Sequence, residues 1–333
     1  MRGVAEGRPT GAGAGKILVT GASGQIGTEL VAALRQRHGM KSVVSSDLHE
    51  PDTGWSESFI FTAVDVLDRE ALEATVETYR IGVIYHLAAL LSATGEKDPV
   101  LCQRVNIGGL VNVLEVARAH GLRVFAPSSI AVFGPDCPTI ANQDAALHPT
   151  TMYGVTKVTG ELLASYYHDV YGVDVRGIRY PGLVSWRTEP GGGTTDYAVD
   201  IFRAALRHRS YTCFVSAETR LPMMYMDDAI RATLELMDAP AESLSGWRGG
   251  YNVAGPSFSA GELAQAIAAR VDGFVCDFEP DVRQTYADSW PDSVDDSVAR
   301  TEWGWSPRFD LRDMVDDMLA NLSATEAPDA TRP

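Results

Sequence analysis

A glycine-rich turn near the start of the sequence constrains the fold of this chain more than any other feature. Gly21, Gly24 and Gly27 recur every three residues, directly after the apolar run 17–20 and before a helical pattern. Glycines at this spacing permit a tight turn, a close approach of the backbone to a pyrophosphate and close helix–strand packing. The free N–H groups at the start of the helix favour an anion. The pattern predicts a dinucleotide-binding turn, with an ordinary glycine-rich turn as the alternative. The expected contacts are Gly21, Gly24, Gln25, Ile26 and Gly27.

The sequence up to about residue 180 alternates between short apolar runs and helical patterns. Apolar runs separated by helices pair as parallel strands with right-handed crossovers. The sequence therefore predicts an α/β fold, a doubly wound parallel Rossmann-type sheet with a smaller C-terminal substrate-binding part. The expected strands are residues 17–20, 43–47, 59–66, 83–88, 124–126 and 173–180, and the long expected helices are 106–120 and 151–171.

A carboxylate at the end of the second expected strand indicates which cofactor is bound. Asp47 follows Gly27 by 20 residues. A carboxylate at this place accepts hydrogen bonds from the adenosine ribose hydroxyls and repels a 2′-phosphate, so we expect NAD rather than NADP. Asp65 and Val66, at the end of the third strand, are expected to border the adenine. In both places, an Asp that only caps its strand end is the alternative.

The pattern of apolar runs loosens after Pro181 and predicts two parts. Within the second part, residues 226–237 resemble a helix and 251–254 a strand, and both are expected to return to the Rossmann sheet. The expected organisation is a disordered leader (1–15), an NAD-binding Rossmann domain (16–183), a mainly substrate-binding part (184–323) and a tail (324–333).

Composition argues against several classes of function. Asp and Glu number 44 against 28 Lys and Arg, so the 333-residue chain has a net charge of −16. Such a surface repels nucleic acid and anionic membranes. The sequence has no uninterrupted apolar run of about 18 residues, so we expect no membrane span. Its four cysteines form no Cys-x-x-Cys pair, so we expect no metal site and a reducing, cytoplasmic location.

Tyr153 and Lys157 carry the expected chemistry. Their spacing places a phenol and an ammonium on one face of the helix 151–171. A phenol titrates near about 10, and a neighbouring positive charge favours the phenolate, so the pair forms a usable acid–base group. A chance surface pair is the alternative. Ser129, or as second choice Ser128, leaves the fifth strand where it can bind the substrate oxygen, unless it only caps the following turn.

These motifs resemble those of the extended short-chain dehydrogenase/reductase superfamily, which includes the UDP-galactose 4-epimerases. The resemblance covers residues 16–319, and its motifs are the turn 20–27, the segments 86–89, 128–129, 153–157 and 179–182, and Asn106. It implies that NAD also contacts the ends of later strands. The implied cofactor contacts are Leu87, Ala88, Ala89, Asn106, Tyr153, Lys157, Tyr180 and Pro181.

One branch of the superfamily fits better than the sugar-nucleotide enzymes. The strings 90–99, 190–198 and 221–229 resemble those of the short-chain type L-threonine 3-dehydrogenases. Gly182 stands where sugar-nucleotide members usually have Asn. The resemblance therefore implies an amino-acid substrate.

The same branch implies where the substrate lies. Ser92, Thr194 and Trp290 are the implied substrate contacts, beside Ser129 and Tyr153. Threonine is a zwitterion that hydroxyls and backbone N–H groups can orient without an arginine, so Thr195 fits the same role. Hydroxyls that only cap loops, and a Trp290 that only packs, are the alternatives.

Together these features predict NAD-dependent oxidation of L-threonine at its β-carbon to 2-amino-3-oxobutyrate, with Tyr153 as general base. Two alternatives stay open: a sugar-nucleotide epimerase or dehydratase, and a non-catalytic NAD(H)-sensing protein. Helices 105–120 and 151–171 carry apolar residues on more than one face, which indicates that they are buried or paired. The superfamily resemblance implies that these two helices meet their copies in a homodimer. Examples of these apolar residues are Val111, Leu114, Leu162, Leu163 and Tyr166.

Overall fold

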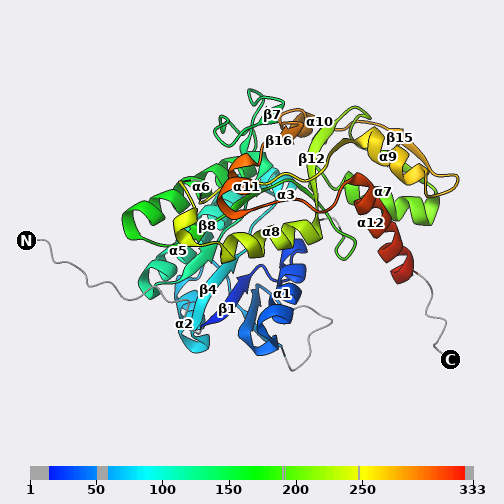
Figure 1. Cartoon of the computed structure of the whole chain (residues 1–333). Coiled ribbons are helices and arrows are strands. Elements are labelled where there is room, and N and C mark those ends of the chain that lie inside the picture. The colour runs from blue at the N-terminus through cyan, green and yellow to red at the C-terminus, as the bar shows by residue number, and fades with distance from the viewer. Residues whose placement is uncertain (1–14, 51–58, 190, 192, 247, 327–333) are drawn as a thin grey trace, which may run out of the picture.

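A computed structural model describes residues 15–50, 59–189, 191, 193–246 and 248–326 (Figure 1). The leader expected at 1–15 and the tail expected at 324–333 lie mostly outside these residues. The strands are β1 Lys16–Thr20, β2 Val43–Asp47, β3 Ile60–Ala63, β4 Ile81–His86, β5 Arg123–Phe125, β6 Ser128–Ser129, β7 Ile140–Ala141, β8 Val175–Arg176, β9 Ile178–Tyr180, β10 Gly182–Val184, β11 Ser210–Cys213, β12 Arg220–Tyr225, β13 Tyr251–Asn252, β14 Ser257–Ser259, β15 Val275–Phe278 and β16 Ser293–Val294.

Helices connect most of these strands. The α-helices are α1 Gln25–His38, α2 Arg69–Tyr79, α3 Ser92–Lys97, α4 Pro99–Gln103, α5 Gly109–His120, α6 Met152–Tyr171, α7 Tyr197–His208, α8 Met226–Asp238, α9 Ala260–Ala268, α10 Arg283–Ala287, α11 Ser297–Trp303 and α12 Leu311–Glu326. A π-helical turn, η2 Arg104–Gly108, joins α4 to α5, and the short 3₁₀ turns are η1 Met40–Ser42, η3 Ile130–Val132 and η4 Ala241–Ser243.

Six parallel strands form the central sheet, in the order β3-β2-β1-β4-β5-β8. Thr20 at the end of β1 is in register with Ser46 and His86, so the carboxyl ends of three strands meet at one edge. Beyond this edge, β6 follows β5 in the chain and β9 follows β8. Strand β9 pairs in parallel with both β6 and β13. The predicted doubly wound Rossmann-type fold is confirmed.

Helices cover both faces of the sheet, which explains why its strands read as continuous apolar runs. Successive side chains of a strand point to opposite faces. Val19 therefore packs on one face with Leu30 of α1 and Ala229 of α8. Leu18 packs on the other face, which α2, α5 and α6 cover, for example with Val113.

The strand expected at 173–180 is interrupted. The structure divides it into β8 and β9 at Gly177. A Cβ atom at Gly177 would lie 2.4 Å from the carbonyl oxygens of both Ala126 and Gly249. Backbone thus approaches Gly177 closely from both sides, and the apolar pattern of the strand does not reveal this.

The helical stretch Pro99–His120 is long and apolar enough to cross a membrane by length and composition alone. In this fold it is a core helix of the α/β layer. Leu110, Val113, Leu114 and Ala117 are buried against the sheet together with β4 and β5.

The second half of the chain builds a smaller unit on the carboxyl edge of the sheet. Its strands form the sheets β10-β12-β14 and β11-β15. Its core consists of α7, α9 and α12 packed on these strands, with Phe202, Leu263 and Met318 fully buried. Between these elements the chain returns to the large sheet, where α8 packs on α1 and β13 extends the strand ladder.

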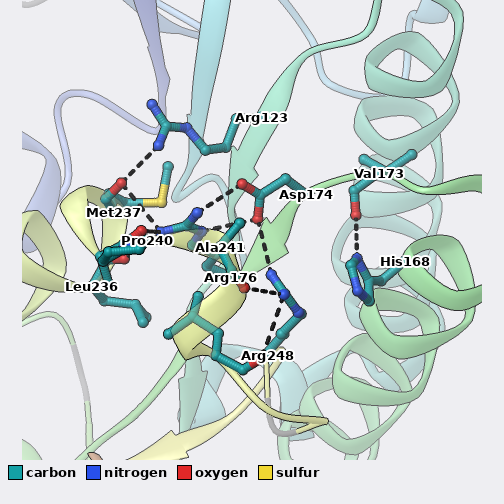
Figure 2. Close-up of polar contacts among 12 residues, drawn as sticks. Arg123, His168, Val173, Asp174, Arg176, Leu236, Met237, Pro240, Ala241 and Arg248 are labelled. Atoms are coloured by element: carbon teal, nitrogen blue, oxygen red, sulfur yellow. Dashed lines mark hydrogen bonds and ion pairs between the residues drawn. The ribbon is translucent and has the colours of Figure 1, made fainter. Parts of the chain in front are cut away.

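A cluster of arginines ties the end of α8 to the sheet (Figure 2). Arg176 in β8 donates to the carbonyls of Leu236 and Ala239, each at 2.7 Å, and Arg123 in β5 donates to that of Met237 at 2.8 Å. Positive side chains at a helix C-terminus satisfy its last carbonyls and oppose its dipole. Asp174 binds Arg176 through both carboxylate oxygens.

Candidate active site

The glycine-rich turn between β1 and α1 has the shape of a phosphate cradle. Gly21 has φ of 68°, and a Cβ there would lie 2.6 Å from the backbone nitrogen of Ala88. A Cβ on Gly27 would lie 2.2 Å from the Gly21 carbonyl oxygen. Gly24 is the N-cap of α1 and adds no side-chain cap, and no acidic residue stands in the first turn. The first N–H groups, at Gln25, Ile26 and Gly27, are thus left for an anion, and the cradle fits a dinucleotide pyrophosphate.

Asp47 lies beside this turn, at the end of β2. Its Oδ2 accepts the backbone N–H of Ser23 at 3.0 Å, and its Oδ1 accepts that of Leu48 at 2.8 Å. A ribose next to a bound pyrophosphate would come within reach of this carboxylate. Asp65 is also at a strand end, but its Oδ1 accepts the N–H of Leu67 at 2.9 Å, as expected of a residue that caps its own turn. Its neighbour Val66 is buried.

The other expected cofactor residues lie along the same edge. Leu87, Ala88 and Ala89 follow β4, and the N–H of Leu87 binds the carbonyl of Thr20. Asn106 accepts the N–H of Leu90 at 2.8 Å and donates to the Leu90 carbonyl and to Thr156. Its side chain therefore links the chain after β4 to α6.

The end of β9 lies in register with Ser129 at the end of β6. The side chain of Tyr180 is buried, and its hydroxyl hydrogen bonds to Thr233. Pro181 lies between β9 and β10.

The structure brings Tyr153, Ser129 and Lys157 together at this edge. Lys157 lies one helical turn after Tyr153 on α6, with Nζ 5.4 Å from the centre of the phenol ring. The same ammonium donates to the carbonyl of Pro127 at 2.8 Å. Ser129, at the end of β6, hydrogen bonds to Tyr153 and accepts the N–H of Ala131.

Ser128, the second candidate for the catalytic hydroxyl, is engaged elsewhere. Its Oγ donates to Oε1 of Glu161 at 2.5 Å, and it is only 4% exposed. Arg179 binds both oxygens of the same carboxylate, at 2.9 and 2.8 Å. Successive strand residues face opposite ways, so Ser129 is the better candidate at Tyr153.

Burial dominates the acid–base properties of the site. It raises the pKa of Tyr153 to about 12, while the hydrogen bond from Ser129 acts in the opposite direction. It lowers the pKa of Lys157 to about 8. Burial, helped by the charge of Lys157, lowers the pKa of His86 to about 3, so this imidazole stays neutral. The raised pKa of Tyr153 differs from the sequence expectation of a favoured phenolate, since loss of hydration outweighs the hydrogen bond from Ser129.

A cavity of about 30 Å³ lies next to Lys157. Its polar lining includes His86, Asn106, Ser128 and Glu161. A polar cavity of this size has room for one or two waters. The lysine thus lines a polar cavity with room for water, in addition to lying beside the phenol.

The two segments expected to hold the substrate lie next to each other. A Cβ on Gly191 would lie 3.4 Å from Cδ1 of Leu91, the residue before Ser92. Ser92 and Thr194 are buried, while Thr195 is half-buried. Trp290 packs against the cluster that contains η3, directly after Ser129.

Sequence reasoning missed two carboxylates that support the site. Glu161 follows Lys157 by four residues on α6, so the helical period that paired Tyr153 with Lys157 could also have revealed it. Glu96 accepts the N–H of Met152 at 2.6 Å and so links α3 to the start of the catalytic helix. Its position in the string 90–99 was the available signal.

The fold and this site define a dinucleotide-dependent enzyme of the short-chain dehydrogenase class. The model of the NAD dependent epimerase/dehydratase family matches residues 17–254, and the chain belongs to that family. Its cofactor is NAD.

Relatives and solved structures agree with this assignment. An uncharacterized epimerase/dehydratase of Staphylococcus haemolyticus is 46% identical over 93% of this chain and 98% of its own length. The GalE-like L-threonine dehydrogenase of Cupriavidus necator, in its holo form, is 53% identical, with a TM-score of 0.90 over 92% of this chain and 99% of its own. A monomeric L-threonine 3-dehydrogenase from a metagenome is 52% identical, with a TM-score of 0.90 over 93% and 99% of the two chains.

Proposed function

We propose that this protein oxidises L-threonine at the β-carbon to 2-amino-3-oxobutyrate. The observation that supports it most is the cluster of Tyr153, Ser129 and Lys157 beside the glycine-rich turn, next to the substrate segments around Ser92 and Thr194. The likeness to solved L-threonine 3-dehydrogenases at about half identity supports the choice of substrate.

Each residue of the cluster has a separate role. Ser129 donates to the β-hydroxyl oxygen and holds it near the phenol. Tyr153 accepts the hydroxyl proton, and Lys157 stabilises the phenolate and can reach the nicotinamide ribose. NAD+, when bound, would supply the acceptor of the β-hydrogen as hydride, so that the net products would be the ketone, NADH and a proton.

The protein must also orient a small zwitterion. Hydroxyls of Ser92, Thr194 and Thr195 can bind its carboxylate and ammonium, and Trp290 can close the apolar side around the methyl group. NAD binding is assigned to the turn residues, Asp47, Asp65, Val66 and the strand ends at 87–89 and 180–181.

An NADH absorbance assay tests the proposal. Purified protein with NAD+ and L-threonine is expected to produce NADH. L-serine lacks only the methyl group, so its kcat/KM should be lower by the equivalent of roughly 1–3 kcal/mol of transition-state binding. UDP-glucose and UDP-galactose are incubated in parallel and analysed for epimer exchange. Exchange of the sugars without NADH from threonine would favour an epimerase, and NAD+ binding with neither activity would favour a sensor.

We further propose a homodimer in the cytoplasm. Leu162, Tyr166 and Val170 on α6 are 67%, 50% and 54% exposed, which leaves an apolar stripe on this helix. The four cysteines are free thiols, which suits a reducing compartment.

A further inference from the structure

A buried carboxylate on the cofactor helix contacts the substrate half of the molecule. Glu29 follows the last glycine of the turn by two residues and is only 6% exposed. The hydroxyl of Ser185, which is 1% exposed, donates to it. Nε of Arg187 lies 3.6 Å from its other oxygen, and Ser185 Oγ accepts the N–H of Arg187 at 3.1 Å.

The segment held by Glu29 is also packed against the proposed substrate residues. Ser185 directly follows β10, in which a Cβ on Gly182 would lie 2.7 Å from Cγ2 of Thr195. The carbonyl oxygen of Trp186, which follows Ser185, accepts a hydrogen bond from Nη2 of Arg203 in α7 at 2.9 Å. Helix α7 begins two residues after Thr195. Residues 182–187 are thus fixed by α1 on one side and by Thr195 and α7 on the other.

Stability alone is a poor reason for a carboxylate at this place. Burial raises the pKa of Glu29 and the charge of Asp227 adds to the increase, against the opposing effects of Ser185 and Arg187. Buried charged groups often contribute little net stability compared with apolar residues of the same size, but they do fix geometry.

We propose that Glu29 is a positioning residue that couples occupancy of the cofactor turn to the placement of Thr195 and the start of α7. An anion at the start of α1 steadies this helix, and the Glu29–Ser185 contact passes the restraint to β10. Coupling of this kind is reciprocal, so substrate would also tighten cofactor binding. The substrate half of this inference rests on the proposed threonine site.

Hydrogen exchange with NAD+ alone tests the coupling without any assumption about substrate. NAD+ is expected to slow amide exchange of residues 183–187 in the parent. Ser185→Ala and Glu29→Ala should lower this protection by about fivefold or more, the range of typical coupling factors. Glu29→Gln keeps a hydrogen-bonding partner for Ser185 and should retain most of it. Gln36→Ala, on the exposed side of α1, is the matched control and should match the parent.

A kinetic measurement adds the substrate side. Ser185→Ala is expected to raise KM for L-threonine about fivefold with little change in kcat, whereas partial unfolding would lower kcat alone. Equal NAD+-dependent protection in the parent, Ser185→Ala and Glu29→Ala would overturn the coupling. Failure of the parent to oxidise threonine would remove only the proposed substrate, because the exchange experiment still decides on Glu29.

Discussion

At the scale of single residues, Tyr153 is the most direct test of the chemistry. Tyr153→Phe is expected to lower kcat by roughly 10²–10⁴ with nearly unchanged NAD+ affinity, because only the proton acceptor is lost. The pKa of Tyr153 is raised to about 12 by burial, so the phenol is protonated at neutral pH before ligands bind. The rate of the parent should therefore rise with pH through neutrality, up to about pH 8, where Lys157 begins to lose its charge. Steady-state kinetics measure both effects, with Tyr79→Phe as control. A loss of only a few-fold in kcat for Tyr153→Phe would show that another residue is the general base.

Asp47 decides cofactor choice at the same scale. The parent is expected to prefer NAD+ over NADP+ by at least about tenfold in kcat/KM, since a 2′-phosphate beside this carboxylate costs about 1–3 kcal/mol. Asp47→Ser should lower the ratio of kcat/KM for NAD+ to that for NADP+, while Glu70→Gln on the exposed face of α2 should leave this ratio unchanged. Equal use of both cofactors by the parent would refute the role of Asp47.

At the scale of elements, Arg176 holds the end of α8 against the sheet (Figure 2). Arg176→Met is expected to lower the free energy of unfolding by about 2–5 kcal/mol, because it removes the donor to carbonyls at the α8 end and leaves Asp174 with only its longer contact to Arg248. Urea denaturation measures the loss. Arg270→Met, which removes a surface pair with Asp316, should cost at most about 1 kcal/mol. Equal losses in both variants would contradict this assignment.

The contribution of the Arg176–Asp174 pair to stability depends on pH in a predictable way. Burial alone would raise the pKa of Asp174, but the hydrogen bond and charge of Arg176 lower it overall. A carboxyl group whose pKa is depressed by folding stabilises the fold above its unfolded pKa of about 3.9, and this stabilisation is lost as pH falls below that value. The parent should therefore lose more stability on acidification than Arg176→Met.

At the scale of the whole molecule, the exposed stripe on α6 predicts self-association. Light scattering at micromolar concentration is expected to give a dimer for the parent and a monomer for Leu162→Glu. Val282→Glu is the matched control, since Val282 is 65% exposed and lies away from α6. A monomeric parent would refute the dimer, and one similar enzyme is described as monomeric.

The sequence alone determined the features that depend on local pattern. The spacing of the glycines and the periodic spacing of apolar residues predicted the turn, α1 and the parallel sheet. Both patterns reflect local properties of the chain, namely the backbone dihedral angles and the direction in which successive side chains point. The four-residue spacing also placed Tyr153 and Lys157 one turn apart on a helix, and the structure has them there.

Tertiary contacts decided the rest. Ser129 was preferred to Ser128 in the sequence analysis, and the buried Glu161 shows that the Ser128 hydroxyl is engaged elsewhere. Leu114 and Leu162 both belong to the apolar patterns of helices α5 and α6, yet Leu114 is fully buried in the chain's own core, whereas Leu162 is exposed. A helix that is apolar all round does not reveal which face meets the sheet. The pKa of Tyr153 also depended on burial, because hydration is lost through contacts between segments distant in sequence.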